Sequence, residues 1–407
     1  MIKIIKYVIK EIKQNGLAHC WKQLNIRIYN FVCPIIGIIV YPFCLITNIR
    51  FINVYTNRIG HLCVEPDCYI KEEILGLHPK YHAIILAPRN KTANTHIIKY
   101  WKKYFKIITN SLLCTLLDPL SKNKFTIYDI HKYAQVINEN AAYTKIQKEY
   151  FGHPPLLFLE KSDYEHGWNI LQNLGLPRDA WFVCLHVRED GYKPREQQLY
   201  RNVDIKNYFL AIKTITDKGG WVIRIGDSSM EYIPDIYHVI DYAHLNIKSD
   251  HMDVFLCASC KFFIGSASGL ITLSNIFNIP AISTNNAPLG VILPYAPRDI
   301  GIPKLIFSTK ENRLLTFKEI FDSQISHYRF DSLYLEANIK TIENSPEDIN
   351  ELTLELIEIT DGTILYTDKD EQLQNAFKSL MNSSHYSYGA VSRVGRTFLK
   401  KHSFLLN

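Results

Sequence analysis

The sequence lacks the signatures of several common protein classes. No G-x-G-x-x-G fingerprint follows a predicted strand, which excludes a dinucleotide-dependent oxidoreductase. The formal net charge is only +6 over 407 residues, and no Arg/Lys-rich stripe is interleaved with stacking aromatics, which argues against a nucleic-acid binder. No fixed-period repeat or long low-complexity segment occurs, and 47% of the residues are apolar, so global disorder is excluded. The length therefore favours two or three globular domains.

A disulfide framework is also missing. The nine cysteines are odd in number, and most lie in apolar runs such as residues 183–185, which is typical of reduced thiols in the cytosol. One C-x-x-C pair occurs, at Cys257 and Cys260, without a second pair elsewhere. We interpret it as two small apolar side chains rather than as a zinc or redox site.

Acidic residues are scarce at the N-terminus. Residues 1–27 carry six basic side chains and one acid, Glu11, and residues 31–48 carry no charge. The uncharged stretch borders on the length that spans a bilayer, but Pro34 and Pro42 would each remove a helix hydrogen bond. We therefore predict a segment, residues 1–49, that lies peripherally on the inner face of the cytoplasmic membrane. The alternative is a helix buried against the rest of the protein.

Strands alternate with helices twice along the chain, which predicts two Rossmann-like α/β domains with parallel sheets. The first domain covers residues 50–160 and the second covers residues 161–330. The final part, residues 331–407, is predicted to be a helical extension with a capped helix after Ser345-Pro346. Predicted strands lie at 50–55, 82–87, 107–109, 181–187, 221–225, 261–264 and 281–283. Predicted helices lie at 95–104, 121–149, 204–216, 250–260 and 269–278, and residues 56–62 are predicted to form a glycine-containing turn.

Three strands of the second domain end in residues suited to an anion such as a diphosphate. Ligands of open parallel sheets bind outside the carboxyl ends of the strands. The turn G-S-A-S-G at 265–269 allows a close approach of the backbone, and the following helix presents its unpaired amides. Arg188 offers a planar fork of donors for phosphate oxygens. The candidate residues are His186, Arg188, Arg224, Asp227, Ser266, Ser268 and Gly269. The alternatives are that the turn only caps a helix and that Arg224 pairs with an acid inside the domain.

Several strings resemble those of bacterial glycosyltransferases encoded in polysaccharide gene clusters: RIGHL, CLHVRED, YRNVDI, WVIRIGD, DVFLCASCKFFIGSASGL and a closing NNAP. The resemblance covers most of residues 50–300 and a C-terminal FLKKHSFLL. More distantly, the chain is similar to core and protein O-fucosyltransferases, which share an R-x-G-[N/H] turn, an H-x-R strand end and a late S-x-S pattern. The resemblance implies the GT-B fold class, in which two Rossmann-like domains face each other across a cleft.

The resemblance also implies roles for single residues. Arg188 would grip the diphosphate of a nucleotide-sugar donor, and Ser266 and Ser268 would hold phosphate. His186 and Asp253 would contact the base. Glu189 stands where some fucosyltransferases carry a second arginine, which weakens GDP-fucose as the donor. The donor is a substrate, so no cofactor is expected.

In a two-domain transferase of this kind, the turn at residues 58–61 faces the acceptor. Inverting transfer needs a general base near the acceptor hydroxyl, and His61, Glu65 or Asp67 could each serve. The identity of the base stays open among these three.

These observations predict an enzyme that moves a hexosyl or deoxyhexosyl group to a glycan or lipid-linked acceptor in bacterial surface polysaccharide synthesis. A metal-dependent GT-A transferase would need an Asp-x-Asp site at a strand end, but the D-x-D motif lies in the polar tail, at residues 368–370. Transfer without a metal ion is therefore expected. The competing hypothesis is a non-catalytic, membrane-associated assembly protein that retains a degenerate sugar-nucleotide fold.

Overall fold

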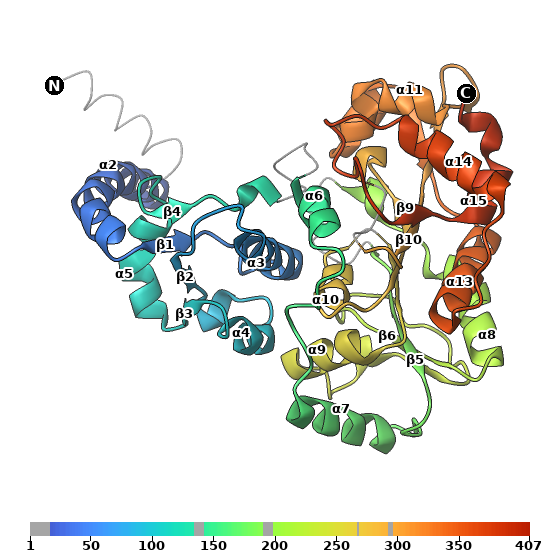
Figure 1. Cartoon of the computed structure of the whole chain (residues 1–407), viewed down its shortest axis with the longest axis horizontal. Coiled ribbons are helices and arrows are strands. Elements are labelled where there is room, and N and C mark those ends of the chain that lie inside the picture. The colour runs from blue at the N-terminus through green and yellow to red at the C-terminus, as the bar shows by residue number, and fades with distance from the viewer. Residues whose placement is uncertain (1–16, 134–141, 190–197, 267, 292–295) are drawn as a thin grey trace. The chain divides into compact units, whose positions relative to one another are not determined.

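The computed structural model describes residues 17–133, 142–189, 198–266, 268–291 and 296–407 (Figure 1). Contacts divide the chain into two compact units. The first unit contains the residues up to Thr56, then Pro79–Thr92 and Trp101–Ile130; the second contains Asn57–His78, Ala93–Tyr100 and the residues from His131 onward. Residues 57–78 thus group with the second unit, although the strand pattern placed them in the first domain.

The first unit is built on a four-stranded sheet whose strands all run parallel, in the order β3-β2-β1-β4. Its strands are β1 (Ile49–Ile52), β2 (His82–Leu86), β3 (Lys106–Ile108) and β4 (Ile127–Tyr128). Two helices pack against each other in this unit, α2 (Leu17–Ile46) and α5 (Ser111–Ser121). The side chain of Asn110 caps α5 by accepting from the backbone N–H of Leu113.

The second unit contains a seven-stranded parallel sheet in the order β14-β10-β9-β8-β5-β6-β7. Its strands are β5 (Phe182–His186), β6 (Trp221–Arg224), β7 (Val239–Ile240), β8 (Phe263–Ser266), β9 (Ala281–Asn286), β10 (Ile300–Pro303) and β14 (Arg393–Val394). Numbered by their order along the chain, the strands lie 7-6-5-4-1-2-3 across this sheet. The order reverses between β5, the first strand, and β8, the fourth. This is the strand order of a doubly wound nucleotide-binding fold, with its switch point between β5 and β8.

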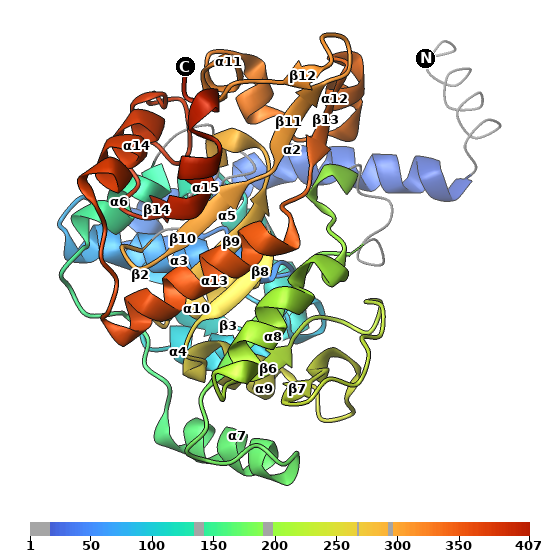
Figure 2. The same ribbon diagram turned by 90° about the vertical axis from the view of Figure 1, so that its right-hand side faces the viewer.

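Helices cover both faces of this sheet. Figure 2 shows α8 (Phe209–Asp217) and α13 (Pro346–Asp361) lying across one face. On the other side, α10 (Ile271–Asn275) contacts α3 (Ile59–Ile74) and α9 (Asp250–Ser259), and α7 (Lys161–Asn173) packs on α9. The remaining helices include α4 (Thr95–Trp101), α6 (Ala142–Glu149), α11 (Phe317–Phe321), α12 (Asp331–Glu336), α14 (Asp368–Ser379) and α15 (Arg396–Lys401). A small antiparallel sheet comprises β12 (Arg313–Leu314), β11 (Leu305–Ser308) and β13 (Ile339–Ile342).

The predicted fold class, α/β with two parallel sheets, is confirmed. The capped helix after Ser345 is confirmed as α13, where Ser345 and Asp348 form a reciprocal capping box. The predicted turn at residues 56–62 is wrong in part, because helix α3 begins at Ile59. The helix expected at 269–278 is shorter than predicted. The helix expected at 121–149 is wrong in part, because β4 lies at Ile127–Tyr128 and the helix α6 covers only Ala142–Glu149, while residues 134–141 lie outside the described residues.

The two ends of the chain differ from the expected pattern. Helix α2 runs through Pro34 and Pro42 without ending at either. Among the described residues, no helix has the length and apolar character needed to cross a membrane. The C-terminal part is more than a helical extension, because β14 pairs with β10 and completes the large sheet.

Candidate functional site

A pocket of about 420 Å³ opens at the carboxyl ends of the strands in the second unit. It lies at the switch point, where the chain leaves β5 and β8 in opposite directions. The segments after β5, β6 and β8 contribute His186–Glu189, Ile225–Asp227 and Ser268–Thr272 to its lining, and the start of α3 contributes residues 57–61. The volume is within the range of small-molecule sites.

Arg188 lines this pocket and is held by the neighbouring strand. Its backbone N–H donates to Ser266 Oγ at 2.8 Å, and its Nε donates to Asn202 Oδ1 at 3.3 Å. Ser266, at the end of β8, is fully buried and lies outside the described lining of the pocket. Ser268 does line it, and its Oγ accepts a long hydrogen bond from the backbone of Leu270 at 3.4 Å. The two serines therefore differ: Ser266 fixes the strand end that carries Arg188, and Ser268 borders the cavity.

His186 is buried in the pocket wall, and Asp253 is half-buried there. Burial lowers the pKa of His186 to about 4, so the ring is neutral at pH 7, and its Nδ1 lies 3.0 Å from the carbonyl oxygen of Ile225. Burial raises the pKa of Asp253, although Lys248, 3.2 Å away, opposes the shift. The hydroxyl of Tyr242 donates to Asp253 Oδ1 at 3.0 Å. A neutral imidazole and a half-buried carboxyl group are both able to hydrogen-bond to a nucleobase.

Arg224, like Ser266, lies outside the described lining of the pocket. Its side chain has no exposed surface, and its guanidinium pairs with Glu189 at 2.6 Å and with Asp241 at 3.1 Å. This is the interior ion pair that we gave as the alternative for this residue. The pairing also explains Glu189, whose carboxylate neutralises Arg224. Asp227 lines the pocket, and its Oδ1 accepts from the backbone N–H of Ser229 at 2.9 Å.

Two glycines bring the start of α3 against the turn after β8. A Cβ atom on Gly60 would lie 3.1 Å from Gly269 Cα, and one on Gly269 would lie 3.0 Å from Gly60 N. The glycine in RIGHL therefore serves helix packing rather than a turn. Because α3 begins here, its first amides lie at the pocket wall, where helix N-termini favour anions.

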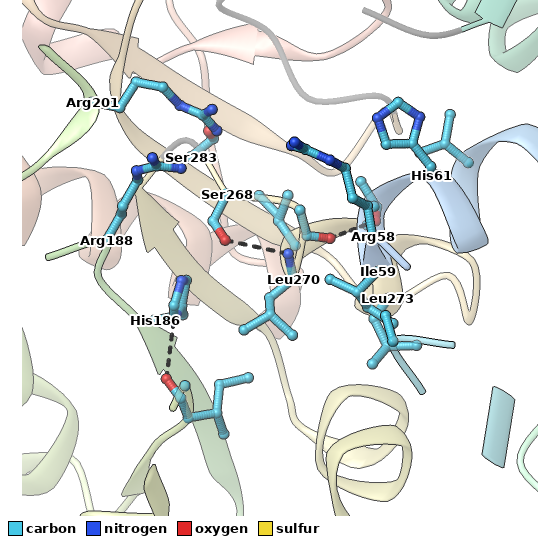
Figure 3. A pocket seen from close by; sticks show the side chains of 18 of the residues that line it. Arg58, Ile59, His61, His186, Arg188, Arg201, Ser268, Leu270, Leu273 and Ser283 are labelled. Carbon is cyan, nitrogen blue, oxygen red and sulfur yellow. Dashed lines mark hydrogen bonds between the residues drawn. The ribbon is translucent and has the colours of Figure 1, made fainter. Parts of the chain in front are cut away.

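His61 and Glu65 form a pair on one face of α3. His61 Nδ1 lies 2.6 Å from Glu65 Oε1, and both residues line the pocket. Figure 3 shows the ring of His61 at the pocket. Asp67 is almost fully buried and pairs instead with Lys71 at 2.7 Å and with Gln147 at 3.0 Å. Of the three candidate bases, the structure places Asp67 outside the described pocket lining.

Cationic residues that strand-end reasoning did not select also border the pocket. Among the described residues, four arginines line it: Arg58, Arg188, Arg201 and Arg329. Figure 3 shows Arg188 and Arg201 beside each other, with Arg58 reaching in from α3. Arg201 lies in the YRN string and Arg58 in the RIGH string, so the motifs contained the signal. Arg329 lies in no such string.

No family model and no curated protein matches the chain. Some solved structures are distantly similar to it. E. coli ADP-heptose LPS heptosyltransferase II is 13% identical, with 59% of this chain and 86% of that chain covered and a TM-score of 0.36. A glycosyltransferase of family 9 from Veillonella parvula is 13% identical, with coverages of 74% and 79% and a TM-score of 0.34. The iron-containing heptosyltransferase TibC of enterotoxigenic E. coli, in complex with ADP-D-β-D-heptose, is 14% identical, with 77% of each chain covered and a TM-score of 0.42.

Proposed function

We propose that this protein is a glycosyltransferase that takes a sugar from a nucleotide-diphosphate donor. The observation that carries the proposal is the position of Arg188, fixed at the switch point of a doubly wound sheet and bordering a pocket with three further arginines. Guanidinium groups bind phosphate oxygens through parallel, charge-assisted hydrogen bonds. Neutral His186 and half-buried Asp253 border the same cavity and suit the base of the nucleotide.

The transfer step needs charge stabilisation on one side and a base on the other. When the bond between the anomeric carbon and the diphosphate breaks, negative charge grows on the leaving group, and Arg188 and its neighbours stabilise it. These cations take the part that a metal ion plays in other transferases, so transfer proceeds without a metal. His61 accepts the proton of the acceptor hydroxyl, whose oxygen forms the new bond to the anomeric carbon, and the carboxylate of Glu65 orients the imidazole.

Titration calorimetry tests donor binding. The wild-type chain is titrated with UDP-, GDP-, CMP- and TDP-sugars and with ADP-heptose, beside Arg188→Ala and the control Arg178→Ala. Arg178 is partly exposed and pairs with Glu165 outside the described pocket lining. Loss of one charge-assisted contact should raise the Kd of R188A about 10- to 100-fold and leave that of R178A unchanged. Absence of binding to every donor by the wild type would refute the proposal.

We also infer that the first unit attaches to an anionic membrane surface. One side of α2 packs on the rest of the unit through hydrogen bonds. Tyr29 donates to Asp118 at 2.8 Å, and Cys33 donates to Pro119 O at 3.0 Å. Asn123 donates to Cys33 O at 2.7 Å. The opposite side is exposed and apolar. This apolar face consists of Phe31, Ile35, Ile38, Ile39, Phe43 and Ile46 on α2, and Leu112, Leu113 and Leu116 are exposed on α5.

Basic residues near this apolar face favour lipids with anionic head groups. Lys22 on α2 and Lys124 after α5 are exposed, and residues 1–27 are strongly basic. An apolar helix face beside basic residues suits the interface of a membrane with anionic head groups, and a peripheral site on the cytoplasmic leaflet follows.

Co-sedimentation with vesicles tests this attachment. Vesicles of phosphatidylcholine alone and with phosphatidylglycerol are mixed with the wild type, the double variant I38E/I39E, and the control L335E, which alters an exposed leucine of the second unit. Burial of one isoleucine stabilises binding by about 1.5–3 kcal/mol, so the double variant should bind at least about 100-fold more weakly. Equal sedimentation of wild type and double variant would contradict attachment through this face.

A further inference from the structure

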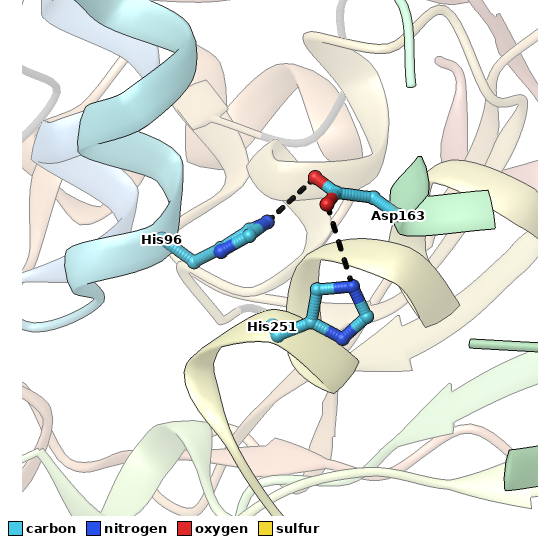
Figure 4. Close-up of side chains that lie close together, drawn as sticks. All are labelled: His96, Asp163 and His251. Atoms are coloured by element: carbon cyan, nitrogen blue, oxygen red, sulfur yellow. Dashed lines mark hydrogen bonds and ion pairs between the residues drawn. The ribbon is translucent and has the colours of Figure 1, made fainter. Parts of the chain in front are cut away.

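Three metal-ligating side chains meet where α4, α7 and α9 begin, all within the second unit (Figure 4). The ligating atoms of His96, Asp163 and His251 all lie within 4.8 Å of one another. His96 Nε2 is 2.7 Å from Asp163 Oδ2, and His251 Nε2 is 3.7 Å from Asp163 Oδ1. All three residues lie outside the described lining of the sugar-nucleotide pocket.

The three helix ends are held together by contacts that do not use the ligating atoms. The backbone N–H and the hydroxyl of Thr95 both donate to Asp250 Oδ2 at 2.6 Å, and Asn94 donates to Asp250 O at 3.0 Å. Helix α7 approaches α9 closely at Gly167, where a Cβ atom would strike the ring of Phe255. The histidines and the aspartate are therefore brought together by the fold itself, which is the preorganisation that a metal site requires.

The ring nitrogens of His251 lack hydrogen-bond partners among the described residues. Both nitrogens are also shielded from solvent. A neutral imidazole carries one donor and one acceptor, and leaving both unsatisfied is costly. His251 Nε2 faces Asp163 at a distance too long for a hydrogen bond but suited to two ligands of one ion. Tetrahedral zinc with bonds of about 2.0–2.1 Å places its donor atoms about 3.3 Å apart.

The surroundings of Asp163 are those of a metal-binding carboxylate. The hydroxyl of Tyr100 donates to its Oδ2 at 2.6 Å, which orients the group as an outer hydrogen bond does in metal sites. Lys99 lies 3.4 Å from Oδ1, but its charge is balanced by Glu160 at 2.5 Å.

We propose that His96, Asp163 and His251 bind one Zn²⁺ ion that clamps the starts of α4, α7 and α9. The exposed ring of His166, one turn along α7 from Asp163, lies beside this cluster with its centroid 4.7 Å from that of His251, but it is not one of the three clustered ligands. Imidazole and carboxylate ligands without thiolates suit zinc. An ion that joins three helix starts outside the described pocket lining has a structural role, and it is independent of the proposed sugar transfer.

Elemental analysis and thermal unfolding of the full chain test this site, with a matched pair of variants. His251→Leu removes a ligand. His402→Leu removes another buried histidine whose two ring nitrogens also have no partner in the described chain, but which belongs to no such cluster there. Replacing an unpartnered buried ring with leucine is neutral or stabilising when no ion is present. The change in Tm caused by His251→Leu should therefore have the opposite sign to that caused by His402→Leu only if a metal is bound.

We expect about one zinc ion per wild-type and H402L chain, and background zinc in H251L. A strong chelator should lower the Tm of the wild type and of H402L, and added Zn²⁺ should restore it, whereas the Tm of H251L should respond to neither. Co²⁺ in place of zinc should give the intense visible bands of a tetrahedral site. Equal zinc content in wild type and H251L, or a Tm of the wild type that the chelator leaves unchanged, would overturn the proposal. Neither readout depends on donor binding.

Discussion

At the scale of single residues, the two serines of the turn after β8 have separate tasks. Ser266 accepts the backbone N–H of Arg188 inside the domain, and Ser268 borders the pocket. Sequence reasoning selected both for the same role because both hydroxyls follow a strand end. Only the pairing of β5 with β8 shows which of them meets the backbone of the neighbouring strand.

Ser266→Ala should therefore destabilise the fold, whereas Ser268→Ala should not. The first change leaves a buried N–H without its acceptor, at a cost of about 1–3 kcal/mol in the free energy of unfolding. The second removes only a long hydrogen bond at the rim, so its effect should stay within about 0.5 kcal/mol. Urea unfolding measures both. Equal stabilities of the two variants would show that the Ser266 hydrogen bond does not hold the strand ends together.

His186 should make stability depend on pH. Its pKa is lowered from 6.5 to about 4, so below about pH 6.5 the unfolded chain binds a proton that the folded chain excludes. The free energy of unfolding should fall as the pH drops from 6.5 towards 4, and the contribution of this group reaches about 3 kcal/mol. Above pH 6.5 the contribution is constant.

Unfolding in urea at several pH values checks this, with His186→Asn as the comparison. Asparagine can still donate to the carbonyl oxygen of Ile225 but does not titrate, so the slope of stability against pH should become shallower. Other buried histidines, among them His385 and His402, titrate in the same direction and remain in both proteins. Identical slopes would contradict the shift at His186.

Local sequence reasoning gave the interior position of Arg224 only as an alternative and did not identify its partners. The residue does end a strand at the binding edge, but its partners Glu189 and Asp241 are 35 and 17 positions away in the chain. An arginine that can find two carboxylates inside the domain stays there, because a buried unpaired charge is costly. Strand ends thus predicted the location of the site, and tertiary contacts decided which side chains reach it.

At the scale of elements, the buried strands were the most predictable part. A parallel strand covered on both faces reads as a continuous apolar run, so β5, β6 and β8 lie within a few residues of their predicted positions. The start of α3 was missed for the opposite reason. A glycine beside charged and polar residues suggests a turn, whereas Gly60 is required because Gly269, in the turn after β8, packs against it.

Substituting alanine at Gly60 should weaken the contact between α3 and the turn after β8. A methyl group there overpacks the contact by about 1–3 kcal/mol, which exceeds the gain in helix propensity of up to about 1 kcal/mol. The same reasoning applies to Gly269→Ala. Because both methyl groups force the same two segments apart, the double variant should cost less than the sum of the single variants. Thermal unfolding of the three proteins measures this, and stabilisation by either single change would refute the close contact.

At the scale of the whole molecule, the two parallel sheets share the strand order of one half of a doubly wound nucleotide-binding fold. In each of them the first strand lies in the interior of the sheet and the third lies at one edge. In the larger sheet this order creates the crevice that the proposed donor occupies. A ligand that binds only the folded state adds its binding energy to stability.

A saturating nucleoside diphosphate should therefore raise the thermal stability of the chain. At about 100 times its Kd the gain is about 2.7 kcal/mol. Differential scanning fluorimetry of wild type and Arg188→Ala, each with and without UDP, GDP, CDP, TDP or ADP, measures this. The increase in Tm should be smaller in R188A at equal ligand concentration. An equal increase in both proteins would place the nucleotide elsewhere.

The edge strand β14 has a consequence for how the protein is made. Residues 393–394 supply the seventh strand of the large sheet, although the first strand of that sheet begins at Phe182. During synthesis, β10 emerges from the ribosome long before its neighbour exists, and its backbone groups stay unpaired along one side. Until nearly all of the described sequence has been translated, this open edge can pair with strands of other chains, so the nascent domain must be protected from aggregation.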